Sequence, residues 1–184
     1  MKKRLLIPVG LLAVATFATA QMGGGDKAKR PSPPANAECK FSDGKMVKVD
    51  YSSPRAKGRK IFGTENEKAL VPYGKVWRAG ANEATAFVTD TNLTVGGKAV
   101  PAGNYTIFAI PNADAWTLII SKKTGEWGTD YPGEKEDEAR VTMAVAKTSG
   151  PVENFTIAFE PSGKTCALRM EWENTRASVE ISEK

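Results

Sequence analysis

The sequence predicts an all-β fold, an antiparallel β-sandwich or barrel of about ten short strands. Two observations carry this prediction. Apolar residues alternate with polar ones over many short runs, as in strands that have one face on the core and the other in water. Turn residues, mostly Gly, Pro, Asn and Asp, separate these runs every several residues, and little of the chain has helical periodicity.

The start of the chain has the three parts of a secretory signal peptide. Lys2, Lys3 and Arg4 form a charged beginning, and the apolar run 5–18 that follows is too short to span a bilayer comfortably. The small residues at 18–20 predict cleavage before Gln21. We therefore expect residues 1–20 to be removed and the mature protein to be periplasmic or extracellular, with no transmembrane segment after cleavage.

The next stretch, 21–37, is rich in Gly, Pro and Lys and has no apolar side chain suited to anchoring a core. This composition predicts a disordered tether. Residues 38–184 are then long enough for one domain with a sizeable core, and we expect a single β-sandwich domain there.

The strands of this domain are placed by their alternation. Asp43-Gly44, just before the alternating run 47–51, indicates a hairpin. Further strands are expected at 84–89, 93–95, 105–110, 116–121, 141–145, 155–159, 165–172 and 177–181. A long loop is expected over 122–135, and one helical turn fits 65–70.

Charge and composition exclude several classes of function. Removing the three cations of residues 1–20 lowers the formal net charge from +5 to +2, a weak excess that argues against nucleic acid as the main partner. The chain has no His, which excludes Ser-His-Asp and Cys-His catalysis and His-ligated metals. No nucleotide-binding or calcium-binding loop is present, so we predict no cofactor and no metal.

Cys39 and Cys166 are the two cysteines of the chain. An even number of cysteines in an exported protein favours a disulfide between them. Two buried free thiols are the alternative, whereas a metal pair is a poor fit because two thiols without His make an incomplete zinc site.

The stretch 51–85 breaks the alternation and gathers cations, amides, a carboxylate and aromatics. Arginine side chains suit carboxylate or phosphate, amide and carboxylate groups suit hydroxyls, and indole rings offer flat faces. The candidate ligand-binding residues are Arg55, Arg59, Trp77, Arg78, Asn82 and Glu83, with Trp127 from the long loop. We expect the first six to converge on one concave surface. The alternative is structural: Arg78 and Glu83 form an ion pair that holds an irregular crossover, with Trp77 in the core. Under both interpretations we expect Arg78 and Glu83 to lie in contact with each other.

Long motifs in this stretch and beyond it resemble a family of exported bacterial proteins known as domain of unknown function 2911. The resemblance rests on YSSPR at 51–55, KGRKIFG at 57–63, LVPYGKVWR at 70–78, GANEAT at 80–85, PAGNY at 101–105 and WENTR at 172–176. It covers nearly the whole chain after the tether. It implies an exported all-β domain without an assigned activity, and it supplies no catalytic residues.

Three kinds of function remain open on the sequence. The first, which the sequence favours over an enzyme, is a non-catalytic binding or interaction module for a small anionic or carbohydrate ligand or an envelope protein. The second is a hydrolase or lyase without His, with Glu83 and an acid from 130–138 as its pair of carboxylates. The third is a purely structural protein.

Overall fold

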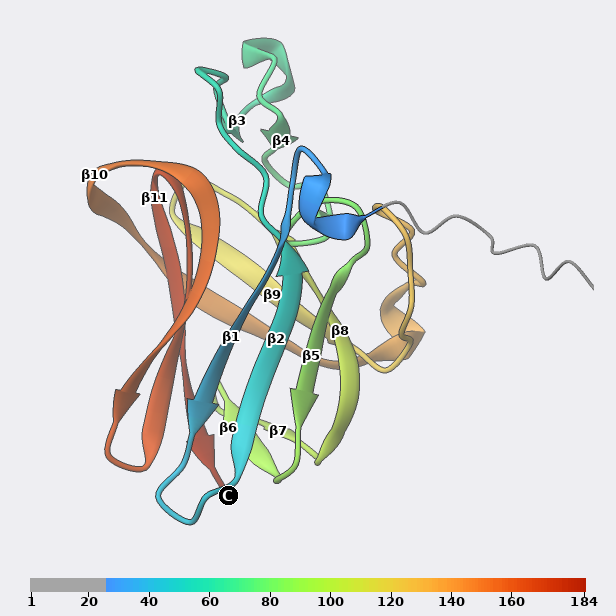
Figure 1. Ribbon diagram of the computed structural model, residues 1–184, viewed down its shortest axis with the longest axis vertical. Helices are drawn as coiled ribbons and strands as arrows, with labels where there is room; N and C mark the ends of the chain where they lie inside the picture. Colours follow the sequence, from blue (N-terminus) through green and yellow to red (C-terminus); the bar gives the residue numbers. More distant parts are fainter. Residues whose placement is uncertain (1–25) are drawn as a thin grey trace, which may run out of the picture.

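The computed structural model describes residues 26–184 and is almost entirely antiparallel β-structure, which confirms the predicted fold class (Figure 1). Its strands are β1 (Pro34–Lys40), β2 (Met46–Ser52), β3 (Phe62–Gly63), β4 (Val71–Pro72), β5 (Thr85–Thr89), β6 (Leu93–Val95), β7 (Lys98–Val100), β8 (Gly103–Ile110), β9 (Ala115–Ser121), β10 (Asp137–Ser162) and β11 (Thr165–Glu183). Three single turns of 3-10 helix complete it: η1 (Lys27–Lys29), η2 (Glu65–Glu67) and η3 (Glu134–Glu136). The leader predicted for residues 1–20 lies outside the described residues.

Nine strands form one sheet in the order β1-β2-β5-β8-β9-β10-β11-β6-β7, with every neighbouring pair antiparallel. The β1–β2 hairpin turns at Asp43-Gly44, where the sequence predicts it, and Gly44 has the left-handed φ of +92° that such turns need. β3 and β4 pair with each other in parallel and project beyond one end of the sheet (Figure 1). The helical turn expected over 65–70 is η2, between these two strands.

The first strand begins inside the range predicted as a tether. β1 starts at Pro34, and its backbone pairs with β2 from Pro34↔Ser52 to Lys40↔Met46. Only Cys39 of this strand is buried, so backbone pairing rather than apolar side chains holds it. An edge strand accepts a proline because one side of its backbone needs no hydrogen bond. The tether prediction is therefore wrong for residues 26–37, while residues 21–25 lie outside the described part.

The last two strands are long and bent. The sequence predicts four separate runs there, and the structure joins them into β10, of 26 residues, and β11, of 19. The register of this pair shifts between Lys147 and Thr156, where the hairpin bends. The second half of β10 then lies against β1 and against the residues that directly follow β2. Two hydrogen bonds mark this contact: Ser53 Oγ donates to the carbonyl of Phe155 at 2.7 Å, and Phe155 N–H donates to the carbonyl of Pro54 at 2.8 Å.

Cys39 of β1 and Cys166 of β11 form the predicted disulfide, with their Cα atoms 6.5 Å apart. Both cysteines are buried. The bridge links two strands that are not neighbours in the sheet, so it fastens the edge strand β1 to β11.

The core beneath the stretch 51–85 is a cluster of aromatic rings. It consists of Phe62, Trp77, Trp116, Phe155 and Trp172, all buried. Trp77 stacks on Trp172 with ring centroids 5.9 Å apart and planes at 20°, and it meets Phe155 edge-on at 4.8 Å. The irregular stretch therefore rests on a rigid floor. Within residues 26–184, no helix has the length and apolar character needed to cross a membrane.

Candidate functional site

Trp77 fixes the position of the central stretch. Its backbone exchanges two hydrogen bonds of 2.8 Å with Ala109 of β8, and its indole Nε1–H donates to the carbonyl of Gly80 at 3.0 Å. The ring is almost fully buried in the aromatic cluster. Trp77 is thus chiefly a core residue, which is the structural alternative considered for it from the sequence, although it also lines the cavity described below.

The turn after Trp77 is held from several sides. Thr85 Oγ1 donates to the carbonyl of Ala79 at 2.7 Å, and Ala81 N–H donates to the carbonyl of Ser52 at 3.1 Å. Ala79 and Asn82 both have left-handed φ values, 49° and 57°. These conformations are rare for residues other than glycine and persist only where the surroundings enforce them. The turn therefore presents the side chain of Arg78 in a fixed place.

Arg78 has a charged side chain for which the described residues supply no partner. Its guanidinium is partly buried, and its Nε is fully buried without a hydrogen-bond partner among the residues that the structure describes. No carboxylate between residues 26 and 184 lies within ion-pair distance of it. Burial lowers the pKa of Arg78 from its ordinary value, yet an arginine stays protonated in proteins. A charged fork donor thus stands without an acceptor among residues 26–184.

This guanidinium borders a cavity of about 280 Å³, which we call the Arg78 cavity. Its lining residues are Ser32, Pro54, Arg59, Leu70, Val71, Trp77, Arg78, Gly80, Ala81, Thr129 and Trp172. Arg59 brings a second guanidinium, whose Nε donates to the carbonyl of Ala56 at 3.0 Å and whose Nη2 donates to the carbonyl of Arg55. The described lining contains two cations and no carboxylate. Its electrostatic character is therefore suited to an anion.

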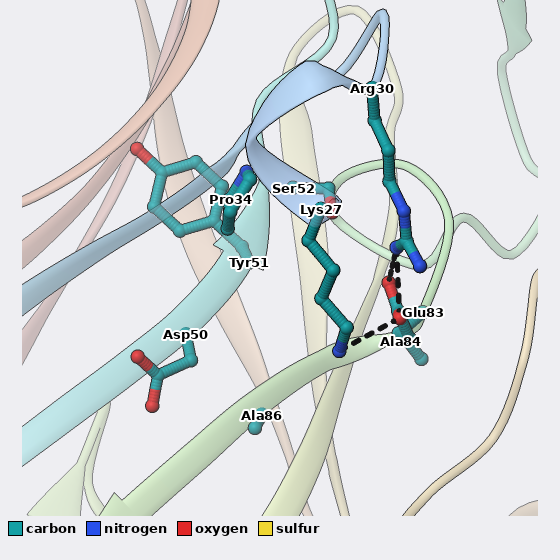
Figure 2. Close-up of a pocket in the computed structure, with 9 residues that line it drawn as sticks. All are labelled: Lys27, Arg30, Pro34, Asp50, Tyr51, Ser52, Glu83, Ala84 and Ala86. Carbon is teal, nitrogen blue, oxygen red and sulfur yellow. Dashed lines mark hydrogen bonds and ion pairs between the residues drawn. The ribbon is translucent and has the colours of Figure 1, made fainter. Parts of the chain in front are cut away.

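Glu83 is engaged elsewhere, as Figure 2 shows. Arg30 Nη1 donates to both carboxylate oxygens of Glu83 at 2.9 Å, and Lys27 Nζ lies 3.3 Å from Oε1. Asn82 Nδ2 donates to the carbonyl of Ser32 at 3.1 Å, which ties the same N-terminal segment to the same turn. We call these contacts the Glu83 clasp. The predicted contact between Arg78 and Glu83 is not formed, because cations from the N-terminal segment occupy the carboxylate.

Hydrogen bonds from its own backbone and from the Glu83 clasp both change the acidity of this carboxyl group. A hydrogen bond from its own backbone N–H, joined by those from Arg30 and Lys27, lowers the pKa of Glu83 to about 2. A general acid must carry a proton near neutral pH, and a carboxyl group with so low a pKa does not. Glu83 thus anchors the N-terminal segment, and its carboxyl group is ionised near neutral pH.

The other predicted residues lie apart from the Arg78 cavity. Arg55 bonds through Nη1 to the side chain of Asn154 and pairs with its backbone, so it fastens the stretch to β10. Trp127 is 58% exposed and borders a separate hollow with Lys123, Asp130 and Tyr131.

Of the six residues expected on one concave surface, the structure brings Arg59, Trp77 and Arg78 together. It places Arg55 and Asn82 outside the lining of that cavity and Glu83 in another hollow.

Several residues of the Arg78 cavity and of the Glu83 clasp were not predicted from the sequence. Trp172 reads as one of the apolar positions of an alternating strand, and nothing in the alternation separates a core ring from one that also borders a cavity. Leu70 precedes a short strand and is 45% exposed. This exposure is a property of the folded structure and cannot be read from the sequence. Lys27 and Arg30, which hold Glu83 and do not border this cavity, belong to the stretch predicted as disordered, so their contact with Glu83 was not predicted.

Comparison with known proteins gives one match. The family model described as "Protein of unknown function (DUF2911)" matches residues 32–181, which is most of the chain and includes both the Arg78 cavity and the aromatic cluster. No curated protein and no solved structure matches the chain.

Proposed function

The chain belongs to the DUF2911 family of proteins of unknown function, and we propose that it is a non-catalytic binding module that holds a small anion in the Arg78 cavity. The observation that carries the proposal is the unused guanidinium of Arg78. A buried polar group without a partner costs free energy, and native proteins keep few of them without a functional reason. A bound carboxylate or phosphate supplies the missing acceptor, because its oxygens match the fork of arginine donors.

The second guanidinium supports the same ligand class. Arg59 borders the cavity from the loop before β3, so that two cations face a space without a competing carboxylate. A cation as ligand would be repelled by this lining, whereas an anion is attracted by both guanidinium groups. The rigid aromatic floor keeps Arg78 in position before the ligand arrives, which reduces the ordering cost of binding.

The carboxylate-dependent hydrolase or lyase receives less support. Such an enzyme needs an acid that is protonated near neutral pH. With a pKa of about 2, Glu83 fits only the base or nucleophile of such a pair, and Arg30 and Lys27 already occupy its carboxylate. None of the described residues that line the Arg78 cavity is Asp or Glu. A binding role requires neither a protonated carboxyl group nor a carboxylate in the cavity.

We also propose that the protein is exported. The support is the signal-peptide pattern of residues 1–20 and the Cys39–Cys166 bridge, since disulfides persist mainly in oxidising compartments.

The binding proposal is tested by titrating oxidised mature protein with phosphate and with acetate. Trp77 and Trp172 border the cavity, so tryptophan fluorescence reports occupancy, and calorimetry checks the result. We expect Arg78→Met to weaken binding about 10- to 100-fold, because a hydrogen bond to a charged group contributes roughly 1.5–3 kcal/mol.

The matched control is Arg55→Met. Arg55 lies in the same stretch and hydrogen-bonds Asn154, but it does not border the cavity. This variant should bind as the wild type does. Equal binding by wild type and Arg78→Met, or no saturable binding of either anion by the wild type, would refute the proposal.

A further inference from the structure

The Arg78 cavity is polar at the two arginines and apolar over most of its remaining wall. Pro54, Leu70, Val71 and Ala81 line it together with the rings of Trp77 and Trp172. Besides the two arginines, its polar side chains are the hydroxyls of Ser32 and Thr129. An anionic head alone would leave this apolar wall in contact with water.

Leu70 is the most informative part of the wall. It is 45% exposed, although the exposure of a leucine side chain to water is unfavourable in free energy. Its backbone N–H donates to the carbonyl of Lys60 at 3.0 Å, and the next residue, Val71, donates to Ile61 at 2.8 Å. These bonds hold the start of β4, so the fold fixes Leu70 at the border of the cavity.

The size and the polar groups of the cavity restrict the class of ligand further. A volume of about 280 Å³ lies at the small end of the range for ligand pockets. A sugar acid of that size carries several hydroxyls, each of which needs a hydrogen-bond partner when it leaves water. Two hydroxyl side chains do not supply enough partners, whereas an aliphatic body requires none.

We propose that the ligand is a monocarboxylate with a short apolar body, its carboxylate on Arg78 and its body between Leu70 and the tryptophan rings. This inference rests on the proposed function, because it names the ligand class of the same cavity. It replaces the broader expectation of any anion or carbohydrate by one class with a polar head and an apolar tail.

The test is a series of straight-chain carboxylates, acetate, butanoate and hexanoate, titrated by tryptophan fluorescence at one pH and one ionic strength. We expect the dissociation constant to fall by about fourfold for each methylene that is buried. Gluconate is the matched probe: it has the six carbons and the carboxylate of hexanoate, but its body carries hydroxyls. It should bind much more weakly than hexanoate.

Leu70→Ser is the decisive variant, because Leu70 is partly exposed and its replacement spares the buried core. It should reduce the gain in affinity from acetate to hexanoate. Val88→Ser is the control: Val88 is 37% exposed on β5 and does not border the cavity, so the whole series should be unaffected. Thermal melts of both variants show whether they fold as the wild type does.

The outcomes separate the two proposals. If acetate and hexanoate bind equally, or if gluconate matches hexanoate, the apolar-body inference is overturned while anion binding at Arg78 stands. The same holds if Leu70→Ser leaves the chain-length dependence intact. If no carboxylate binds, the proposed function fails and the inference fails with it.

Discussion

The Cys39–Cys166 disulfide should contribute a large part of the stability of this fold. The bridge joins β1 to β11 and spans 127 residues of sequence. In the chain-entropy model, closing a loop of that length restricts the unfolded chain enough to stabilise the native state by about 5 kcal/mol at 25 °C. Whole domains of this size are stable by roughly 5–15 kcal/mol, so the bridge is expected to matter greatly.

The assay is urea denaturation of three samples: oxidised wild type, reduced wild type and the double variant Cys39→Ala/Cys166→Ala. We expect the reduced protein to lose about 3–5 kcal/mol, since engineered and natural bridges often give less than the full entropic value. The double variant should lose at least as much, because both cysteines are buried and alanine leaves space behind. The free energy of unfolding of the double variant should not change when reductant is added.

Two results would refute this reasoning. Thiol titration of unfolded, unreduced protein that finds two free thiols would show that the bridge does not form. A loss below about 1 kcal/mol on reduction would show that the link hardly restricts the unfolded chain, contrary to the loop-length argument.

Three further predictions concern acid stability, backbone packing and export. Because the pKa of Glu83 falls from its ordinary 4.5 to about 2, its contribution is complete above pH 4.5 and is lost towards pH 2. The deficit of Glu83→Gln, at most about 1 kcal/mol for such exposed ion pairs, should therefore shrink over that window in urea titrations, and a constant deficit would contradict the clasp. Gly80→Ala should cost roughly 1–3 kcal/mol, since its Cβ would lie 3.0 Å from the carbonyl oxygen of Ser52 and 3.1 Å from Thr85 Oγ1. Unchanged stability would mean that the turn has more room than the structure shows. Mass spectrometry of protein recovered from the periplasm or medium should find Gln21 as the first residue, and an intact Met1 would argue against the signal peptide.

The strands were predictable because their pattern is local. Alternation at period two places one face of each strand on the core, and Asp43-Gly44 marks a hairpin by its own backbone preferences. The bend that joins 141–145 to 155–159 in one strand was not visible, because polar residues interrupt the alternation there and the pairing with β11 simply continues around it. The hairpin signal implies a strand before Asp43, but the start of β1 at Pro34 was not predicted because backbone pairing at a sheet edge needs little apolar pattern.

The candidate site was predictable only in part. Arg78 and Glu83 were candidates because they carry opposite charges and lie close together in the sequence. This closeness suggested an ion pair between them. The left-handed residues Ala79 and Asn82 shape the turn between them. The partner that Glu83 finds instead, Arg30, is 53 residues away, and no spacing rule relates positions so far apart. Which cation remains free for a ligand is thus decided by tertiary structure.

The free energy of unfolding of Arg78→Met, measured without any ligand, tests most directly whether Arg78 is a binding group or part of a clasp. Methionine keeps much of the apolar stem and removes the charge, so the comparison isolates the guanidinium. If Arg78 has no partner in the protein, stability should change by less than about 0.5 kcal/mol or should rise, because an uncompensated charge leaves a partly buried position. If Arg78 instead belongs to a buried ion pair, the variant should lose about 3–5 kcal/mol, and that result would contradict the ligand site proposed at Arg78.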